Sequence, residues 1–142
     1  MKELEAIATA PHVRSEKAEE QLCDDFVARQ VGREGVVRIS QPRNTMQTLG
    51  ISDRRYRVAS LAFWWEVKRA DGVLRTEQVE FLEAELRHGS PAGVGTLEDL
   101  VAYVSELRGV PVDQRRVRGC LSGMELVEKY RVRRKKAKRG KL

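Results

Sequence analysis

The residue types that perform most enzyme chemistry are scarce in this sequence. There are two histidines, His12 and His88, and neither belongs to an HExxH motif. The two cysteines, Cys23 and Cys120, form no CxxC pair, and neither a Walker loop nor a G-x-S-x-G motif is present. The sequence therefore favours a protein that is not an enzyme and that has no cofactor.

Positive charge is the most prominent chemical feature of this sequence. The net charge is +6, and two segments carry most of the positive charge. Segment 36–69 has seven basic and two acidic residues, and segment 129–142 has nine Lys or Arg and no acid. Blocks of like charge often bind polyanions. The candidate phosphate-binding residues of the last segment are Arg133, Arg134, Lys135, Lys136, Lys138 and Arg139. The alternative is that this tail only extends a final helix and keeps the protein soluble.

Hydrophobic periodicity and capping signals predict helices almost throughout the chain. Ser15 caps the first helix, and Thr96 with Asp99 forms a capping box. A run rich in β-branched residues near 36–40 predicts a short strand or an extended linker. A helix of one or two turns fits residues 44–49, and Gly-rich residues 89–95 predict a loop. The longer helices are expected at 16–31, 52–69, 76–88, 96–108 and from 113 onwards. The predicted fold is mostly α, a small bundle of about five helices with a basic tail.

The length of 142 residues predicts one helical domain over 1–128, followed by the basic tail 129–142, mobile or extending the last helix. No apolar run approaches the roughly 18 residues of a membrane span, and no signal stretch follows Met1. The protein is expected to be cytoplasmic, with no membrane partner.

Residues 45–59 resemble a helix-turn-helix. Leu49-Gly50-Ile51-Ser52 has the character of the turn, and a helix capped by Ser52 would follow it. The resemblance implies that Arg54, Arg55 and Arg57 contact phosphates and base edges. The alternative is an ordinary corner between two helices.

Residues 61–82 are similar to the TerB-like and DjlA-like helical domains. The matching positions are Ala70, Asp71, Gly72, Leu74 and Glu77. The resemblance implies an all-helical fold and oxygen ligands from Asp71 and Glu77 for a hard cation such as Ca²⁺. The alternative is a tight turn followed by an ordinary helix start.

Together these features predict a small regulator or adaptor that binds nucleic acid, or a protein complex that handles nucleic acid, in transcription-type regulation. A second hypothesis is a protein-binding module that docks on RNA polymerase or a ribosome. Trp64 and Trp65 would then anchor the contact, because three consecutive aromatic residues cannot all lie on one helix face. A third is a TerB-like metal-binding scaffold.

Overall fold

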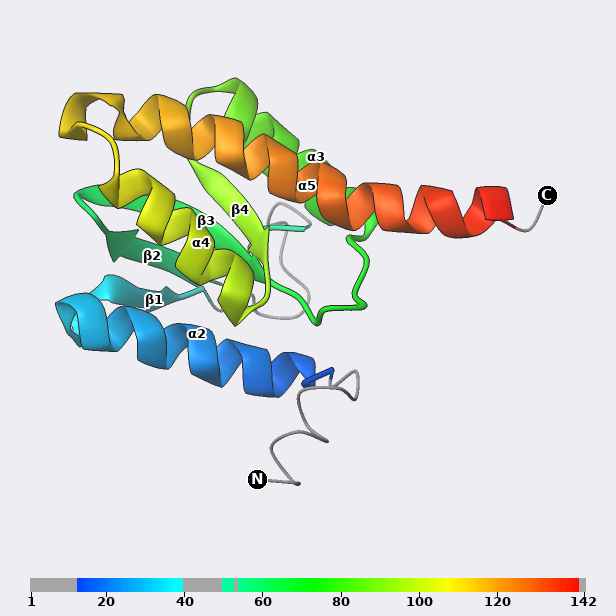
Figure 1. Ribbon diagram of the computed structural model, residues 1–142, viewed down its shortest axis with the longest axis horizontal. Helices are drawn as coiled ribbons and strands as arrows, with labels where there is room; N and C mark the ends of the chain where they lie inside the picture. Colours follow the sequence, from blue (N-terminus) through cyan, green and yellow to red (C-terminus); the bar gives the residue numbers. More distant parts are fainter. Residues whose placement is uncertain (1–12, 40–49, 53, 141–142) are drawn as a thin grey trace.

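A mixed four-stranded sheet covered by helices forms the core, so the prediction of a mostly α five-helix bundle is wrong (Figure 1). The computed structural model describes residues 13–39, 50–52 and 54–140, with side chains described as far as Arg131. The helices are α2 (Glu16–Val31), α3 (Thr76–Arg87), α4 (Leu97–Arg108) and α5 (Arg115–Gly140). The strands are β1 (Val36–Arg38), β2 (Arg54–Val58), β3 (Leu61–Val67) and β4 (Ala92–Gly95). Two 3-10 turns, Arg33–Gly35 and Val112–Gln114, complete the described elements.

The expected helix over 52–69 is instead a hairpin of β2 and β3. Alternate residues such as Tyr56 and Val58 are buried, which is the period of a strand. Aromatic residues dominate β3, and they favour strands. The turn residues Ala59 and Ser60 both have positive φ, 58° and 65°, as a two-residue hairpin turn requires. A strand therefore lies where the helix-turn-helix resemblance needs its second helix.

The other predicted helices are confirmed close to their expected limits. Ser15 Oγ accepts a hydrogen bond from the Ala18 amide at the start of α2, and Thr96 and Asp99 cap α4 reciprocally. A short strand at 36–38 is also confirmed. The expected loop 89–95 is wrong in part, because its second half is β4. The short helix expected at 44–49 lies outside the described residues.

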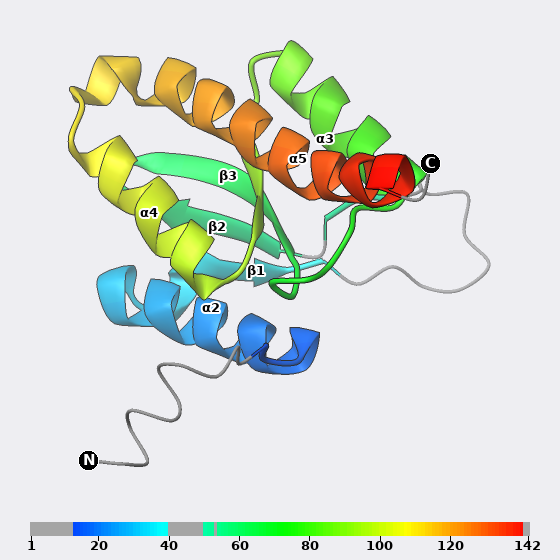
Figure 2. The ribbon, with the colours of Figure 1, turned by 45° about the vertical axis from the view of Figure 1, so that its right-hand side comes forward.

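The sheet order is β1-β2-β3-β4, with β3 and β4 parallel and the other pairs antiparallel. Helices α2 and α4 cover one face over a core of buried β2 and β3 side chains, with Trp65 the largest. A second core joins α3, β4 and α5. Figure 2 shows α2 and α5 on opposite sides of the strands. Because β2 runs opposite to the other three strands, it starts at the edge of the sheet where β1, β3 and β4 end.

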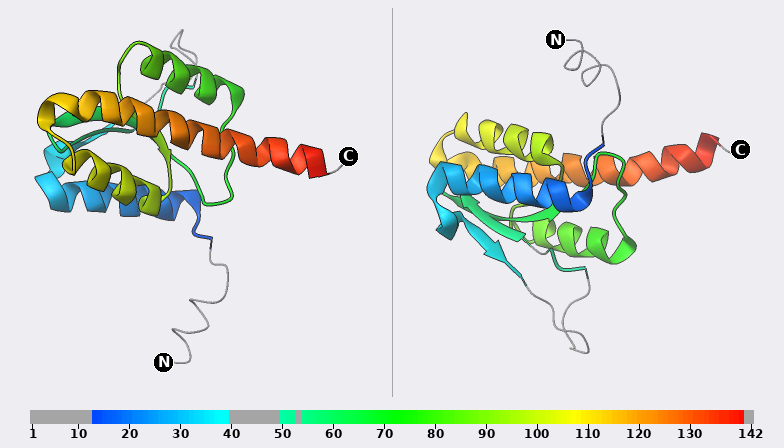
Figure 3. Two further views of the ribbon diagram at one scale, coloured as in Figure 1. Left: turned by 45° about the horizontal axis from the view of Figure 1, so that its top comes forward. Right: turned by 90° about the horizontal axis from the view of Figure 1, so that it is seen from below.

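Helix α5 runs along β4 and continues beyond the other elements. A Cβ at Gly123 would lie 1.9 Å from the carbonyl oxygen of Ala92, so glycine allows this close approach. Both views in Figure 3 show the last turns projecting past the body. The basic tail thus extends the final helix to Gly140. No helix in the described ranges has the length and apolar character to cross a membrane.

Candidate functional site

The three candidate arginines of residues 54–57 lie on β2 and have different surroundings. Arg54 is buried, and its Nε donates a hydrogen bond of 2.9 Å to Asp24. Arg55 lies over the ring of Trp64, with its Cζ 4.7 Å from the ring centroid. Arg57 is exposed and donates a hydrogen bond to the carbonyl of Glu34. The strand separates Arg54 from the other two, which lie on the opposite face.

Neither tryptophan stands free in solvent. Trp65 is fully buried in the core under α2 and α4. Trp64 packs edge-on against Phe81, and its Nε1 donates a hydrogen bond of 2.5 Å to Glu85 on α3. Packing of the sheet against the helices therefore accounts for both aromatic side chains.

The two candidate metal ligands, Asp71 in the turn before α3 and Glu77 in the first turn of α3, each have an arginine partner. Arg69 Nε lies 3.0 Å from Asp71 Oδ1, and Arg75 Nε lies 3.6 Å from Glu77 Oε1. Among the described residues, no group of three or more His, Cys, Asp or Glu is placed to hold a metal ion. The side chains of residues 133–139 lie outside the described part of the chain.

A polar pocket of about 570 Å³ opens at the edge of the sheet where β3 ends. Glu66 and Lys68 line it from the end of β3 and the residue just beyond. Because they are two positions apart on an extended backbone, their side chains lie on the same face, opposite Trp65. Glu66 is 8% exposed, and the Lys68 side chain is 11% exposed. The remaining lining residues are Glu16, Ile39, Gly50, Ile51, Arg75 and Gln78.

Two helices begin at this pocket. Glu16 is the first residue of α2, and Arg75 is the N-cap of α3. Lys68 Nζ lies 4.0 Å from Glu16 Oε1, and the Lys68 amide extends the β3–β4 ladder by bonding the Gly95 carbonyl at 3.0 Å. Helix N-termini carry partial positive charge and attract anions. The pocket thus combines carboxylates, one amine and an electrostatic environment that suits phosphate.

Gly50 forms one wall of the pocket and packs directly against the first turn of α3. Gly50 has φ +78°, and a Cβ there would lie 2.0 Å from the carbonyl oxygen of Glu77. Gln78 is buried and accepts a hydrogen bond of 2.9 Å from the Arg75 amide. The first turn of α3 is therefore held in place from both sides, and with it the shape of the pocket.

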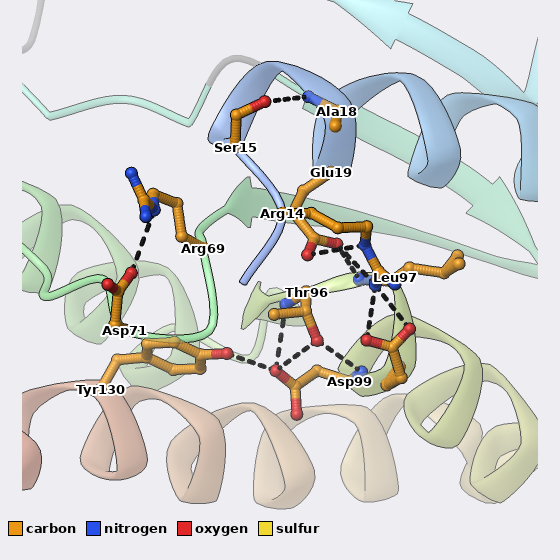
Figure 4. Close-up of polar contacts among 11 residues, drawn as sticks. Arg14, Ser15, Ala18, Glu19, Arg69, Asp71, Thr96, Leu97, Asp99 and Tyr130 are labelled. Carbon is orange, nitrogen blue, oxygen red and sulfur yellow. Dashed lines mark hydrogen bonds and ion pairs between the residues drawn. The ribbon is translucent and has the colours of Figure 1, made fainter. Parts of the chain in front are cut away.

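A cluster of ion pairs fixes the first turn of α2 (Figure 4). Glu16 lies in that turn. Arg14 contacts Glu98 of α4 at 2.6 Å and Glu19 of α2 at 3.1 Å. Hydrogen bonds to Glu98 and then to Glu19 raise the pKa of the Arg14 guanidinium. Glu19 also accepts the Leu97 amide at 2.9 Å. The beginnings of α2 and α4 are thus tied together.

Sequence reasoning did not single out Glu66, Lys68 or Gln78. The available signal was a Glu-x-Lys triplet at the end of an apolar run, Leu61-Ala62-Phe63-Trp64-Trp65. That signal has meaning only on a strand, because a helix would place the two side chains about 200° apart. Because a helix was predicted over 52–69, Glu66 and Lys68 were not recognised as neighbours on one face.

Comparisons of this chain with protein-family models, with curated proteins and with solved structures found no match.

Proposed function

We propose that this protein is a divalent-metal-dependent hydrolase of phosphodiester bonds in nucleic acid. The observation that carries the proposal is the pocket at the end of β3, where the carboxylate of Glu66 and the amine of Lys68 lie on one face at the start of α3. The site combines groups that suit a metal ion with groups that suit a phosphate.

The metal would be Mg²⁺ or Mn²⁺, held by Glu66 with help from Glu16. Mg²⁺ prefers oxygen ligands and commonly uses only one or two carboxylates, with water and substrate phosphate filling the remaining positions. The pocket therefore needs no cluster of three protein ligands. A bound ion of this kind lowers the pKa of its water and stabilises charge on the phosphate oxygens.

Lys68 would stabilise the negative charge that builds up on the phosphate and orient the attacking water. In the reaction, the water oxygen forms a bond to phosphorus while the bond to one bridging oxygen breaks. The attacking water loses a proton to solvent, and the leaving oxygen ends protonated. The N-terminus of α3 adds partial positive charge on the same side.

Nucleic acid is the favoured substrate because of the charge beyond the pocket. Arg75 lines the pocket and Arg69 follows Lys68 along the chain, and both arginines are exposed. Helix α5 projects past the body at the end of the molecule where β3 terminates, and residues 133–140 of its sequence include six Lys or Arg (Figure 1). This basic composition favours a polyanion as the substrate.

The pocket leads us to prefer hydrolysis over the regulator that the sequence favoured. The regulator hypothesis drew on a helix beginning at Ser52, and residues 54–58 form a strand. Nucleic-acid binding through the tail is common to both hypotheses, so cleavage is the property that separates them.

The test is cleavage of fluorescently labelled single-stranded DNA, duplex DNA and single-stranded RNA by the full chain with Mg²⁺, with Mn²⁺ and with EDTA. We expect metal-dependent cleavage that falls by about 100-fold or more in Glu66→Gln and in Lys68→Met. Glu80→Gln, an exposed carboxylate on α3, and Asp71→Asn are the matched controls and should cleave normally.

Three results would contradict the proposal. One is the absence of cleavage with either metal on all three substrates. Another is cleavage that Glu66→Gln leaves unchanged. A third is loss of activity in Asp71→Asn equal to that in Glu66→Gln, which would move the metal to the turn before α3. Tight binding without cleavage would instead support the regulator hypothesis.

A further inference from the structure

Helix α5 carries a stripe of exposed apolar side chains on its outer face. Val117, Leu121 and Met124 are 63%, 44% and 49% exposed. Their spacing of four and three residues places them on one side of the helix, in the pattern of a coiled-coil seam. Large apolar side chains grouped in this way are uncommon on a monomer and mark contact surfaces.

An apolar groove lies beside the C-terminal end of this stripe. It has a volume of about 340 Å³ between α3 and α5, and Leu86, Met124 and Val127 form its apolar lining. Its charged rim consists of Glu83, Arg87 and Glu128. The molecule therefore has a projecting apolar side chain at Val117 and an apolar recess two to three turns further along the same helix.

We propose that two copies of this chain associate through antiparallel pairing of their α5 helices along this stripe. In a two-fold dimer each contact occurs twice with the roles exchanged. Placing Leu121 beside the partner's Met124 brings Val117 level with the partner's Glu128, at the mouth of the groove. Each copy then inserts Val117 into the recess of the other.

The charges along the stripe favour this antiparallel register over a parallel one. Arg118 and Glu125 are seven residues apart, so they lie on the same side of the stripe. In the antiparallel pair Arg118 of one protomer approaches Glu125 of its partner, twice. A parallel pair in register would place the Arg118 and Glu125 side chains of the two copies on opposite sides of the seam, where they could not pair. The Arg118 side chain is 42% exposed beside Glu106, which leaves it accessible to a second partner.

The experiment is sedimentation velocity of the full chain across micromolar concentrations. We expect a species of twice the 16.2 kDa chain mass, converted to the single-chain mass in Leu121→Glu. The matched control is Val101→Glu, which adds the same charge at a 36% exposed apolar position on α4 and should keep the doubled mass. Circular dichroism checks that each variant is folded.

A charge exchange tests the register. Arg118→Glu alone and Glu125→Arg alone should each sediment as single chains, because like charges then face each other twice. An equimolar mixture of the two variants should recover the doubled mass, because every facing pair is again Arg with Glu. A parent chain that is monomeric at all concentrations, a doubled mass that persists in Leu121→Glu, or a mixture that stays monomeric would overturn the proposal. The dimer does not depend on the proposed hydrolysis.

Discussion

The Nε–H of Arg54 donates a hydrogen bond of 2.9 Å to Oδ1 of Asp24, and both side chains are buried. The same carboxylate accepts the hydroxyl of Tyr56 at 2.7 Å and Nη2 of Arg38 at 3.1 Å. Asp24 of α2 is therefore hydrogen-bonded to residues of both β1 and β2. Arg54 has a structural role, and its charge is matched within the fold.

We expect Asp24→Ala to lower the free energy of unfolding by about 3–5 kcal/mol, because it leaves the Arg54 guanidinium buried without its partner. Urea unfolding measures the effect. Asp25→Ala is the matched control on the same helix: Asp25 is exposed and accepts a hydrogen bond from Gln21, so its loss should cost less than about 1 kcal/mol. Equal losses in the two variants would contradict a structural role for Asp24.

Gly50 and Gly89 allow backbone strain to be separated from crowding. Their φ angles are +78° and +77°, but a Cβ at Gly89 would meet nothing within 4 Å. Gly89→Ala should therefore cost about 1 kcal/mol for the left-handed backbone alone. Gly50→Ala should cost clearly more and should also impair cleavage, because it pushes against the start of α3. Differential scanning calorimetry measures the stability of both variants. Equal losses of stability would show that the backbone around Gly50 moves to accommodate a Cβ at no cost.

Asp99 should contribute to acid stability. Burial opposes its ionisation, but hydrogen bonds from Lys129, Tyr130 and Thr96 outweigh burial and lower its pKa below 3.8. The folded state therefore favours the charged form. That stabilisation is present above the unfolded pKa and is lost as the pH falls through the lower folded pKa. In Asp99→Asn, urea unfolding should show less stability at neutral pH and a smaller decrease below pH 3.8 than in the parent. Parallel pH profiles would contradict the assignment.

The extension of α5 should contribute a salt-dependent part of nucleic-acid affinity. Removing residues 132–142 deletes seven Lys or Arg. On duplex DNA, each lost phosphate contact should flatten the log–log dependence of affinity on salt by about 0.9. Anisotropy across a salt series measures this, and a full-length variant with those seven residues changed to Gln controls for helix length. A slope that neither variant alters would assign the extension to solubility.

The helices that local signals specify could be predicted from the sequence. The Ser15 cap, the Thr96–Asp99 capping box and the apolar period of α3 act within a few residues of the chain, so each helix is recognisable without its neighbours.

The hairpin of β2 and β3 could not be told from a helix by the same reasoning. Tyr56, Val58, Leu61 and Trp65 satisfy a helical period as well as a strand period. The turn at Ala59 and Ser60 has none of the Gly or Asn that usually mark it. Pairing with β1 and β4, and burial under α2, decided in favour of strands.

The sequence by itself determined the four described helices, the caps of α2 and α4 and the basic extension of α5, because those depend on neighbours along the chain. Tertiary structure decided the sheet and the pocket. Glu16, Glu66 and Gln78 are far apart in sequence and meet only because the end of β3 lies beside the first turns of α2 and α3. The same packing paired Arg54 with Asp24. Long-range contacts of this kind are enforced by burial, which the local pattern of residues does not encode.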